Sequence, residues 1–545
     1  MTDELDRDVI DWTEAFLTGD VSRRGFLEGL LGAGLTMAAA TQLVQSLAPV
    51  DVLAASVKPK RGGTLTIGYP DEIPALDPHT SPSESSIRFF YLVYSSLLML
   101  DKHLKPVPDL AESMHISPNG LKYTFKLRKG LKFSNGWPLT SKDVKATFER
   151  ILNPKTVAIA SSFYANIKEI ATPDAHTVVF HLSSPNAALP TYLTSMNSAI
   201  LPARLINSGA DFGKIQNSIG AGPFKVSKWV QDNYMLLSRN PHFYEPGKPY
   251  VDHIKVSIHP TTASLLAAMR GGAVDYTWTL DAITGREAGA GNALNVIRTP
   301  DLSYYLLFLQ TADAPFKSKY TRQAISYAID RKAIISGANL GEGVPVGPIP
   351  VGLKRYALPT SKLAGYKRDI NKAKQLLAQG GQKNGFQFTL LTQRTDPDNA
   401  QAIAQIVQSQ LKDIGLTANI NLMDFTAWVQ YWLKADYQMM PGNNGGGPDP
   451  DVYLYRYFYS QGNLNFVTGH WHSHDLDHQL TVGRSTNNLK VRKAAYDKAQ
   501  KVLVDGSPFI WLYSGYLYSI LSKKVHGFSP RANHSLVGIR DVWLS

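Results

Sequence analysis

Apolar positions follow two different periods along most of the chain. The stretch TLTI at 64–67 is apolar at every second residue, which predicts a strand. The stretch TSKDVKATFERIL at 140–152 is apolar at every third or fourth residue, which predicts a helix. Thr140 or Ser141 would cap this helix, and Asp143 would lie in its first turn. The chain is therefore expected to mix strands and helices.

The clearest alternation lies in the second half of the chain. Strand, helix, strand and helix are predicted in turn by FQFTLLT at 386–392, AQAIAQIVQSQLKDIG at 400–415, TANINLM at 417–423 and FTAWVQYWLKA at 425–435. A strand that returns to the same sheet through a helix runs parallel to the first strand. This half therefore favours α/β layering with a parallel component.

Three further segments give expectations that a structure can test. SSIRFFYLVYSSLLML at 85–100 has helical spacing throughout, and LKYTFKLRKGLKFSNG at 121–136 reads as two strands joined by a Lys-Gly turn. DVYLYRYFY at 451–459 has tyrosines at alternate positions, which indicates a segment at an edge where rings meet water or a ligand. In FTAWVQYWLKA, by contrast, the aromatic spacing mainly describes a helix that packs into a core.

Residues 1–54 have the features of an export signal. SRRGFL places Arg23 and Arg24 before an apolar pair, and a mildly apolar, glycine-rich stretch follows. Glycine and polar residues interrupt that stretch, so it lacks the roughly 18 continuous apolar residues of a membrane span. The pattern resembles a twin-arginine signal, which implies export of a folded protein. The alternative is an amphipathic helix with a chance arginine pair.

Small residues at VLAAS place the expected cleavage after Ala54 or Ala55. The chain contains no Cys, which excludes lipid attachment at a cysteine, disulfides and thiol catalysis. A soluble periplasmic product without a lipid anchor is expected.

Charge changes this picture only slightly. The whole chain carries a formal +12, while the first 54 residues hold three basic and nine acidic side chains, so the remainder carries +18. Such a body can attract nucleic acid, an anionic membrane or anionic solutes. The Lys and Arg residues are scattered, however, which favours a solvated cationic surface and no nucleic-acid partner.

Motifs of enzyme chemistry are absent from the sequence. It has no G-x-S-x-G elbow, no Walker-type loop and no G-x-G-x-x-G that opens a helix after a strand. We therefore expect a protein that is not an enzyme and that needs no cofactor.

A histidine cluster offers a different class of function. HWHSHDLDH at 470–478 contains His470, His472, His474 and His478. Imidazoles suit nickel or zinc, so His472, His474 and His478 are the candidate ligands of a metal or metal-chelate binding protein. The same letters also read as a helix that Ser473 caps, with its histidines facing water.

The stretch MMPGNNGGGPDPD at 439–451 places three glycines beside two asparagines. Glycine has no side chain, so such a stretch lets the backbone approach a partner closely.

The order of several segments carries a resemblance to a known family. The resembling segments are GGTLTIGYPDEIPALDPHT at 62–80, the long run from PVPDLAES to TFERI at 106–151, IGAGPFKVSKW at 219–229, RNPHFYEPGKPYVDHIKV at 239–256, RQAISYAIDRKAII at 322–335 and DINKAKQLLA at 369–378. Together they resemble the dipeptide and oligopeptide-binding family, family 5, of extracytoplasmic solute-binding proteins that serve ABC importers. The resemblance extends from residue 62 to the end of the chain.

This resemblance implies a periplasmic-binding-protein-like α/β fold with two hinged lobes and an inserted domain. The implied ranges are 61–98, 219–310 and 515–545 for the first lobe, 99–218 for the insert and 311–514 for the second lobe. A monomer would capture a peptide or related small polar solute by closure, and it would deliver this solute to an ABC permease in the inner membrane.

The resemblance also implies the residues that line the cleft. They are Ser83, Glu84, Trp278, Phe425, Asn443, Asn444, Gly445, Gly446, Gly447 and Asp449. Peptide-binding members place an aspartate for the ligand's amino group where this chain has Gly446 or Gly447, and their neighbouring aromatic is Asn444 here. Loss of that carboxylate would remove a charge-assisted hydrogen bond of about 1.5–3 kcal/mol, so a non-peptide solute is a serious alternative.

Overall fold

The computed structural model describes residues 23–32, 58–231, 233–394 and 399–545. It divides into two units, Met1–Pro59 and Lys60–Ser545. Within the first unit, α2 (Arg23–Gly32) contains both arginines of the predicted signal in its backbone. The expected cleavage positions lie outside the described residues. None of the described helices is both long and apolar enough to cross a membrane.

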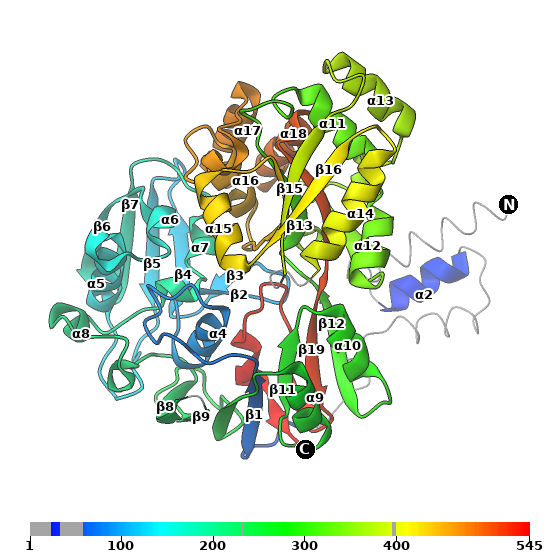
Figure 1. Cartoon of the computed structure of the whole chain (residues 1–545). Helices are drawn as coiled ribbons and strands as arrows, with labels where there is room; N and C mark the ends of the chain where they lie inside the picture. The colour runs from blue at the N-terminus through cyan, green and yellow to red at the C-terminus, as the bar shows by residue number, and fades with distance from the viewer. Residues whose placement is uncertain (1–22, 33–57, 232, 395–398) are drawn as a thin grey trace. The chain divides into compact units, whose positions relative to one another are not determined.

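The second unit is built around two large mixed sheets (Figure 1). In the first sheet, β1 pairs in parallel with β10 and with β11, whereas β19 is antiparallel to β11 and β12. The order of its strands is β12 (Leu294–Pro300), β19 (Tyr516–Ser522), β11 (Tyr276–Thr279), β1 (Thr64–Tyr69), β10 (His253–Ile258), β9 (Tyr234–Arg239) and β8 (Phe224–Val230). The predicted strand at 64–67 is thus confirmed.

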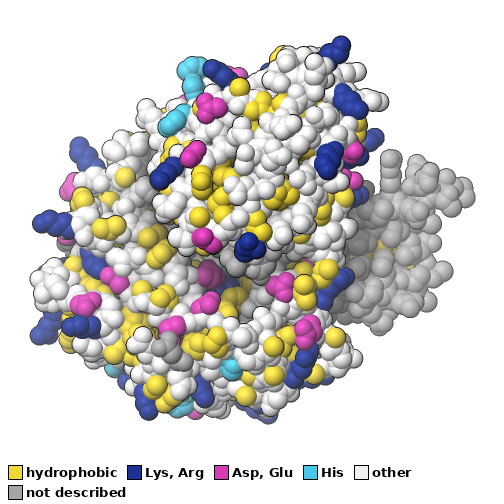
Figure 2. Space-filling model, viewed as in Figure 1, with side chains coloured by type: hydrophobic (Ala, Val, Ile, Leu, Met, Phe, Trp, Pro, Cys, Tyr) yellow, Lys and Arg dark blue, Asp and Glu magenta, His cyan; other side chains and the backbone are white. Residues whose placement is uncertain are grey.

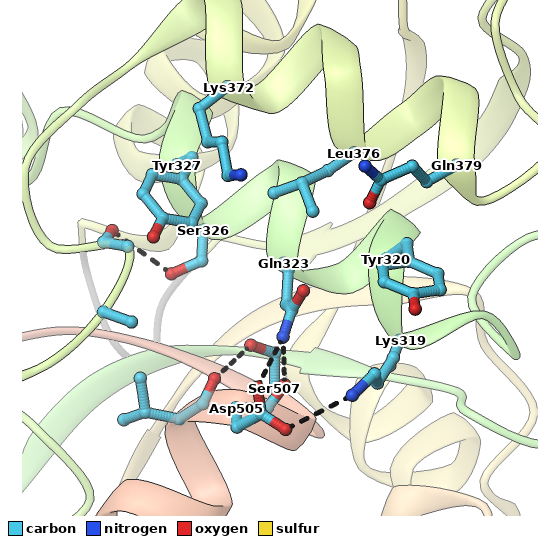
Figure 3. Close-up of a pocket in the computed structure, with 13 residues that line it drawn as sticks. Lys319, Tyr320, Gln323, Ser326, Tyr327, Lys372, Leu376, Gln379, Asp505 and Ser507 are labelled. Carbon is cyan, nitrogen blue, oxygen red and sulfur yellow. Dashed lines mark hydrogen bonds and ion pairs between the residues drawn. The ribbon is translucent and has the colours of Figure 1, made fainter.

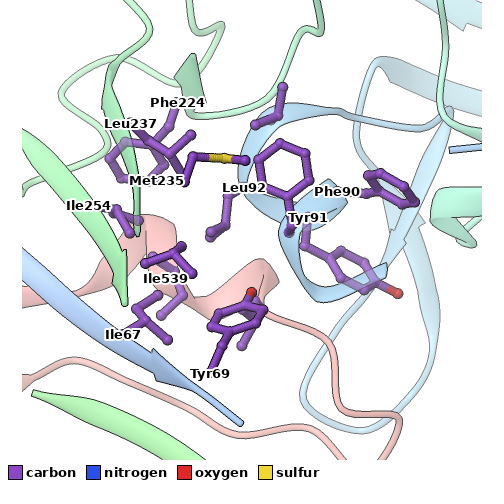
Figure 4. Close-up of a cluster of buried hydrophobic side chains, with 14 of the residues drawn as sticks. Ile67, Tyr69, Phe90, Tyr91, Leu92, Phe224, Met235, Leu237, Ile254 and Ile539 are labelled. Atoms are coloured by element: carbon purple, nitrogen blue, oxygen red, sulfur yellow. The ribbon is translucent and has the colours of Figure 1, made fainter. Parts of the chain in front are cut away.

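Helices cover both faces of the first sheet. A large apolar cluster lies between the strands and α4 (Glu84–Val93), where Ile67, Leu92 and Ile254 are fully buried (Figure 4). A smaller cluster on the other face packs α9 (Thr262–Arg270) and α10 (Ala282–Gly289) against β19. Burial of apolar area at about 25 cal/mol per Å² holds these layers together.

The second sheet contains the predicted strand-helix-strand-helix run. The order of its strands is β14 (Val344–Pro345), β18 (Phe509–Ser514), β13 (Tyr304–Leu309), β17 (Met439–Asn444), β15 (Gln387–Gln393) and β16 (Thr417–Met423). β15 and β16 are parallel over seven residue pairs, with α14 (Ala400–Lys412) between them in sequence, as predicted.

The helices of the second sheet form two layers. α11 (Lys319–Ala328), α12 (Arg331–Asn339), α13 (Ile370–Gln379) and α14 share one apolar cluster with the strands. The other cluster contains α15 (Phe425–Lys434), α16 (Pro450–Phe458), α17 (His474–Ser485) and α18 (Leu489–Gly506). Both faces of this sheet are therefore buried, which explains the near-continuous apolar letters of β13 and β18.

A third sheet lies within residues 111–182. The order of its strands is β4 (Ala111–Ile116), β5 (Lys122–Leu127), β7 (Thr177–Leu182) and β6 (Ile167–Asp174), and all neighbours are antiparallel. α5 (Ser141–Leu152) packs on it, and Thr140, one of the two expected caps, begins the helix. Asp143 accepts hydrogen bonds from the backbone and hydroxyl of Thr140, as in a capping box. Short elements complete the unit: α6 (Ser161–Tyr164), α7 (Leu189–Tyr192), α8 (Ala203–Asn207), and the strand pairs β2 (Leu98–Leu100) with β3 (Pro106–Pro108) and β20 (Val525–His526) with β21 (Trp543–Leu544).

Three expectations from the sequence differ from the structure. The helix predicted over 85–100 ends at Val93, and its last residues form β2 instead. The second strand predicted within 121–136 is wrong, because that segment forms only one isolated bridge. The tyrosine-rich stretch, expected at an edge where its rings meet water or a ligand, forms the helix α16, in which Tyr453 and Tyr457 are buried.

The division into two lobes and an insert stays a prediction, with one difference at a boundary. β13 lies before residue 310, which the resemblance assigns to the first lobe, but it pairs with β17 and β18 of the second sheet. Within the described ranges, the chain crosses between the two sheets twice, at 300–304 and at 514–516. We call the first of these, from Pro300 to Tyr304, the crossing segment.

Candidate functional site

Predicted site residues from both sheets converge on the crossing segment. From the first-sheet side, His534 links the Glu84 carboxylate (2.9 Å) to that of Asp301 (2.7 Å). From the second-sheet side, Asn444 at the end of β17 is the strand partner of Tyr304. Figure 2 shows a recess with acidic side chains along it, between the regions of the two sheets seen in Figure 1.

The Glu84–His534–Asp301 relay is charged at neutral pH. Although burial disfavours the charged form, Asp301 and Glu84 together raise the pKa of His534 to about 9. Burial likewise opposes ionisation of Glu84, but Arg88 and His534 outweigh it and lower the pKa of Glu84 to about 2. His534 also lowers the pKa of Asp301 against the effect of burial. The relay therefore ties the start of α4 to the crossing segment by two charge-assisted hydrogen bonds.

Ser83, Glu84 and Trp278 lie together on the first sheet. Ser83 caps α4 by accepting a hydrogen bond from the backbone of Ser86. Glu84 begins the helix, and one turn later Arg88 donates from its Nε to the Glu84 carboxylate at 3.0 Å. The Arg88 guanidinium carbon then lies 3.8 Å from the centroid of the Trp278 ring, a cation–π contact that joins the helix to β11.

The glycine stretch has three different environments. A Cβ at Gly446 would lie 1.8 Å from the Tyr453 hydroxyl, and one at Gly447 would meet Val452 at 3.1 Å. A Cβ at Gly445 would meet nothing within 4 Å among the described residues. Gly446 is therefore required by packing, whereas Gly445 borders open space, as a wall of a binding site would.

The two asparagines also differ. Asn443 is exposed, but only 4% of Asn444 is exposed. Asn444 donates to the Tyr304 hydroxyl and accepts from the Tyr457 hydroxyl, both at 3.2 Å. Asn444 thus fixes the end of β17, and Asn443 presents its amide to the outside.

Asp449 is fully engaged by protein groups. Its carboxylate forms two hydrogen bonds of 2.8 Å with Arg492 and accepts a third from the backbone of Asp451, where it caps α16. The side chain therefore positions α16 and has no free face for another molecule.

Phe425 begins α15, is 37% exposed, and stacks on Trp428 with 6.1 Å between ring centroids. Trp428 in turn packs against Gly442 of β17.

The histidine cluster is not arranged as a metal site. α17 begins with Ser473 as its cap and Asp475 in the first turn, as one of the two sequence interpretations expected. The rings of His472 and His474 are 6.3 Å apart, centroid to centroid. Within the described part of the chain, no three His, Cys, Asp or Glu side chains lie together as potential metal ligands. The geometry therefore gives no support to His472, His474 and His478 as ligands.

Two pockets lie elsewhere, both beside elements of the second sheet. One of about 340 Å³ is lined by residues of α11, α13 and α18, and Lys319 and Gln323 both contact Asp505 in it (Figure 3). The other, of about 410 Å³, lies beyond the end of β13 and is lined by Asp313 and Tyr431, among others. Neither pocket is lined by any of the site residues that the sequence analysis predicts.

Sequence reasoning missed Arg88, Asp301 and His534. Only Arg88 had a local signal, because it follows Glu84 by four residues on a predicted helix. His534 is 450 residues from Glu84 in sequence, so no local pattern connects them.

The fold has solved counterparts among periplasmic binding proteins. The structure of the PBP AgaA in complex with agropinic acid, from A. tumefacien R10, matches with a TM-score of 0.75 and 29% identity. The match covers 89% of this chain and 99% of that chain. This chain accordingly has a periplasmic-binding-protein-like α/β fold.

The comparison of sequences is more specific. The family model of bacterial extracellular solute-binding proteins, family 5, matches residues 105–465, and this chain belongs to that family. Oligopeptide-binding protein AppA of Bacillus subtilis is 27% identical over 90% of this chain and 93% of its own length. The probable D,D-dipeptide-binding periplasmic protein DdpA of Escherichia coli is 29% identical over 85% of this chain and 91% of its own length.

Proposed function

We propose that this chain is the substrate-binding component of an ABC importer. It captures a peptide or related small polar solute in the periplasm, and two lobes close on the solute about a hinge. The convergence of residues from both sheets on the crossing segment carries this proposal. A short connection between two buried sheets is where a hinge can absorb rotation, and residues beside it change their separation as the lobes close.

The proposed contacts come from both sheets. Glu84 and Trp278 would contribute from the first sheet, and Asn443, Gly445 and Phe425 from the second. Gly445 lets the backbone approach the solute, and the exposed amide of Asn443 supplies a donor and an acceptor. Ser83, Asn444, Gly446, Gly447 and Asp449 would act by positioning these groups, given the contacts described above.

The cargo is proposed as a peptide or another small polar solute because relatives differ in theirs. AppA and DdpA are named for oligopeptides and D,D-dipeptides, whereas AgaA was solved with agropinic acid. This chain also has glycine where peptide-binding members place the aspartate for the amino group. The closed form, a monomer, would dock on a permease of the inner membrane, and no catalytic step is proposed.

Solute capture can be tested on the purified whole chain. Mass spectrometry of small molecules released by denaturation should identify a bound solute, and calorimetry with that solute should give saturable binding. X-ray scattering should show a smaller radius of gyration with the solute than without it. An empty preparation that binds none of a broad panel of peptides and polar nutrients, with unchanged scattering, would refute the function.

A pair of alanine variants tests the site. Asn443→Ala should weaken binding, and Asn371→Ala, an exposed asparagine on α13, should not. Loss of one hydrogen bond to the solute predicts a change of about 3- to 10-fold. Equal affinities of the two variants for the solute would show that Asn443 does not contact it.

Export by the twin-arginine route is proposed for residues 1–54. Replacement of Arg23 and Arg24 by lysine should retain the protein in the cytoplasm, whereas Arg7→Lys should leave periplasmic export unchanged. Cell fractionation with blotting measures this. Normal export of the double variant would exclude the twin-arginine route without affecting the solute-binding proposal.

A further inference from the structure

Arg88 is a buried cation with an incomplete set of partners. Its side chain is 1% exposed, its Nε donates to Glu84 at 3.0 Å, and its guanidinium stacks on Trp278. Its Nη1 and Nη2 atoms find no hydrogen-bond acceptor among the residues that the structure describes. Tyr276 lies beside both the Arg88 guanidinium and the Ser519 hydroxyl, but neither contact has the geometry of a hydrogen bond. Buried donors without acceptors destabilise a protein, so such an arrangement calls for a missing acceptor.

Two hydroxyl groups beside Arg88 also lack hydrogen-bond partners among the described residues. They are the Tyr69 hydroxyl and the Ser519 Oγ. Ser519 is the strand partner of Trp278, and the Tyr69 ring lies 4.8 Å from the Trp278 ring, centroid to centroid. Tyr69 ends β1 and points toward α4 (Figure 4). Donors from two strands, β1 and β19, and from the helix α4 thus lie together beside Trp278 of β11, near the point where the parallel strands β1 and β11 end. The carboxyl ends of parallel strands are the usual place for a ligand in α/β sheets.

The charged groups around Arg88 balance one another. Glu84 and Asp301 contribute two negative charges, and Arg88 and His534 balance them, since the pKa of His534 is about 9. Glu84 is half exposed and precedes Arg88 by one helical turn, so the helix leads from the surface to the buried guanidinium. A single carboxylate beside the Nη atoms would face a cluster that is neutral overall and rich in donors.

We propose that the Nη1 and Nη2 edge of Arg88 binds a carboxylate of the solute, with the hydroxyls of Tyr69 and Ser519 as further donors. The solute class is therefore a small carboxylic acid, or a peptide that presents a carboxylate to the first sheet. A planar guanidinium forms two parallel hydrogen bonds with a carboxylate, and an uncharged amide cannot replace both. This inference rests on the proposed solute-binding function.

The test compares acids with their amides. The whole chain is titrated by calorimetry with dialanine, trialanine, glutamate and gluconate, each as the free acid and as the primary amide, and with any solute released from the purified protein. We expect the wild type to bind at least one acid about 10- to 150-fold more tightly than its amide. Arg88→Gln should abolish this preference because it lowers the affinity for the acid, while the affinity for the amide changes by less than about 3-fold.

Two further variants separate recognition from folding. Arg270→Gln removes an exposed arginine of the same sheet's helix layer and should leave the acid preference intact. Tyr69→Phe removes only a hydroxyl from the site and should reduce acid binding about 3- to 10-fold, which tests the site even if Arg88→Gln does not fold.

The outcomes distinguish the two proposals. If the wild type binds acid and amide equally, or if its released solute has no carboxylate, the role of Arg88 is refuted and solute capture stands. Equal weakening of acid and amide in Arg88→Gln would likewise reduce Arg88 to a packing role against Trp278. If the wild type binds no solute at all and is purified empty, both proposals fail.

Discussion

The buried ion pair between Asp449 and Arg492 gives the sharpest prediction of stability. The carboxylate side chain is 3% exposed and the guanidinium side chain 6%, and two hydrogen bonds of 2.8 Å join them. Burial would lower the pKa of Arg492, but Asp449 and neighbouring tyrosines raise it well above its ordinary value, so the guanidinium stays charged. Asp449→Asn would leave that charge buried without its counterion.

The magnitude follows from what the substituted side chain keeps and what it loses. In Asp449→Asn, the amide oxygen would still accept from the backbone of Asp451, so the cap of α16 survives. The new amide would place a donor against a guanidinium donor, and the compensating charge would be gone. Breaking a buried pair by removal of one partner costs about 3–5 kcal/mol, and we expect a loss in this range.

A partly exposed pair on the same helix provides the matched control. Lys493 and Asp497 of α18 are joined at 2.6 Å, but their side chains are 43% and 28% exposed. Asp497→Asn removes the same chemical group as Asp449→Asn, and an exposed pair is worth only about 0–1 kcal/mol. The comparison therefore isolates burial as the cause of any difference.

Guanidinium denaturation followed by tryptophan fluorescence measures both variants. A chain of this size need not unfold in one step, so the free-energy change is taken from the transition that both substitutions shift. Trp428, Trp432 and Trp471 belong to the same apolar cluster as α16 and α18 and report on it. A difference of less than about 1 kcal/mol between the variants would show that burial of the pair does not govern its contribution.

Three further predictions concern the glycine stretch and the relay. Gly446→Ala should lower stability by about 1–3 kcal/mol because its Cβ would overlap a tyrosine hydroxyl, whereas Gly445→Ala should not, and equal thermal melts would refute this. Asn444→Ala should cost about 1–3 kcal/mol by leaving two buried tyrosine hydroxyls unpaired, and Asn443→Ala, which changes an exposed side chain, should be neutral in the same melts. The raised pKa of His534 contributes on the order of 3 kcal/mol to the free energy of unfolding. This contribution is fully present below pH 6.5 and is lost as the pH rises through about 9. His534→Gln should flatten the pH dependence of the denaturation midpoint over that window, and an unchanged slope would contradict the relay.

Helices and strands with a long, clean period were predictable from the sequence. The run from β15 to α15 was confirmed in type and order. α14 buries one continuous face, whereas α15, expected to pack into a core, buries only Trp428. The strand expected after β5 was wrong for a reason that local pattern cannot contain. β5 already has β4 and β7 as neighbours, so both of its edges are occupied and a following hairpin strand has no place to pair.

α16 shows how a residue pattern can mislead. Tyrosines at every second position suggested rings that meet water or a ligand, but Tyr453 and Tyr457 are four residues apart and share the buried face of a helix. The better signals were Asp449 as a cap and Pro450 at the first helical position, which together mark a helix start. The resemblance indicated which stretch would matter, but the distinction between Gly445 and Gly446 required the position of Tyr453.

The glycine stretch and the relay act on the same few residues of the crossing segment. With Gly446 leaving space for its ring, Tyr453 donates to the carbonyl of Leu302 at 2.6 Å, and Asp301 beside it accepts from His534. The crossing segment is therefore held from the second sheet through α16 and from the first sheet through α4. A molecule that touches Gly445 would lie one residue from Gly446, which makes room for the Tyr453 contact. A molecule that touches Glu84 would directly contact the Glu84–His534–Asp301 relay. We therefore expect solute contacts and the angle between the sheets to be energetically coupled. Loss of the Tyr453 contact or of the relay should change how far the protein closes as well as how tightly it binds its solute.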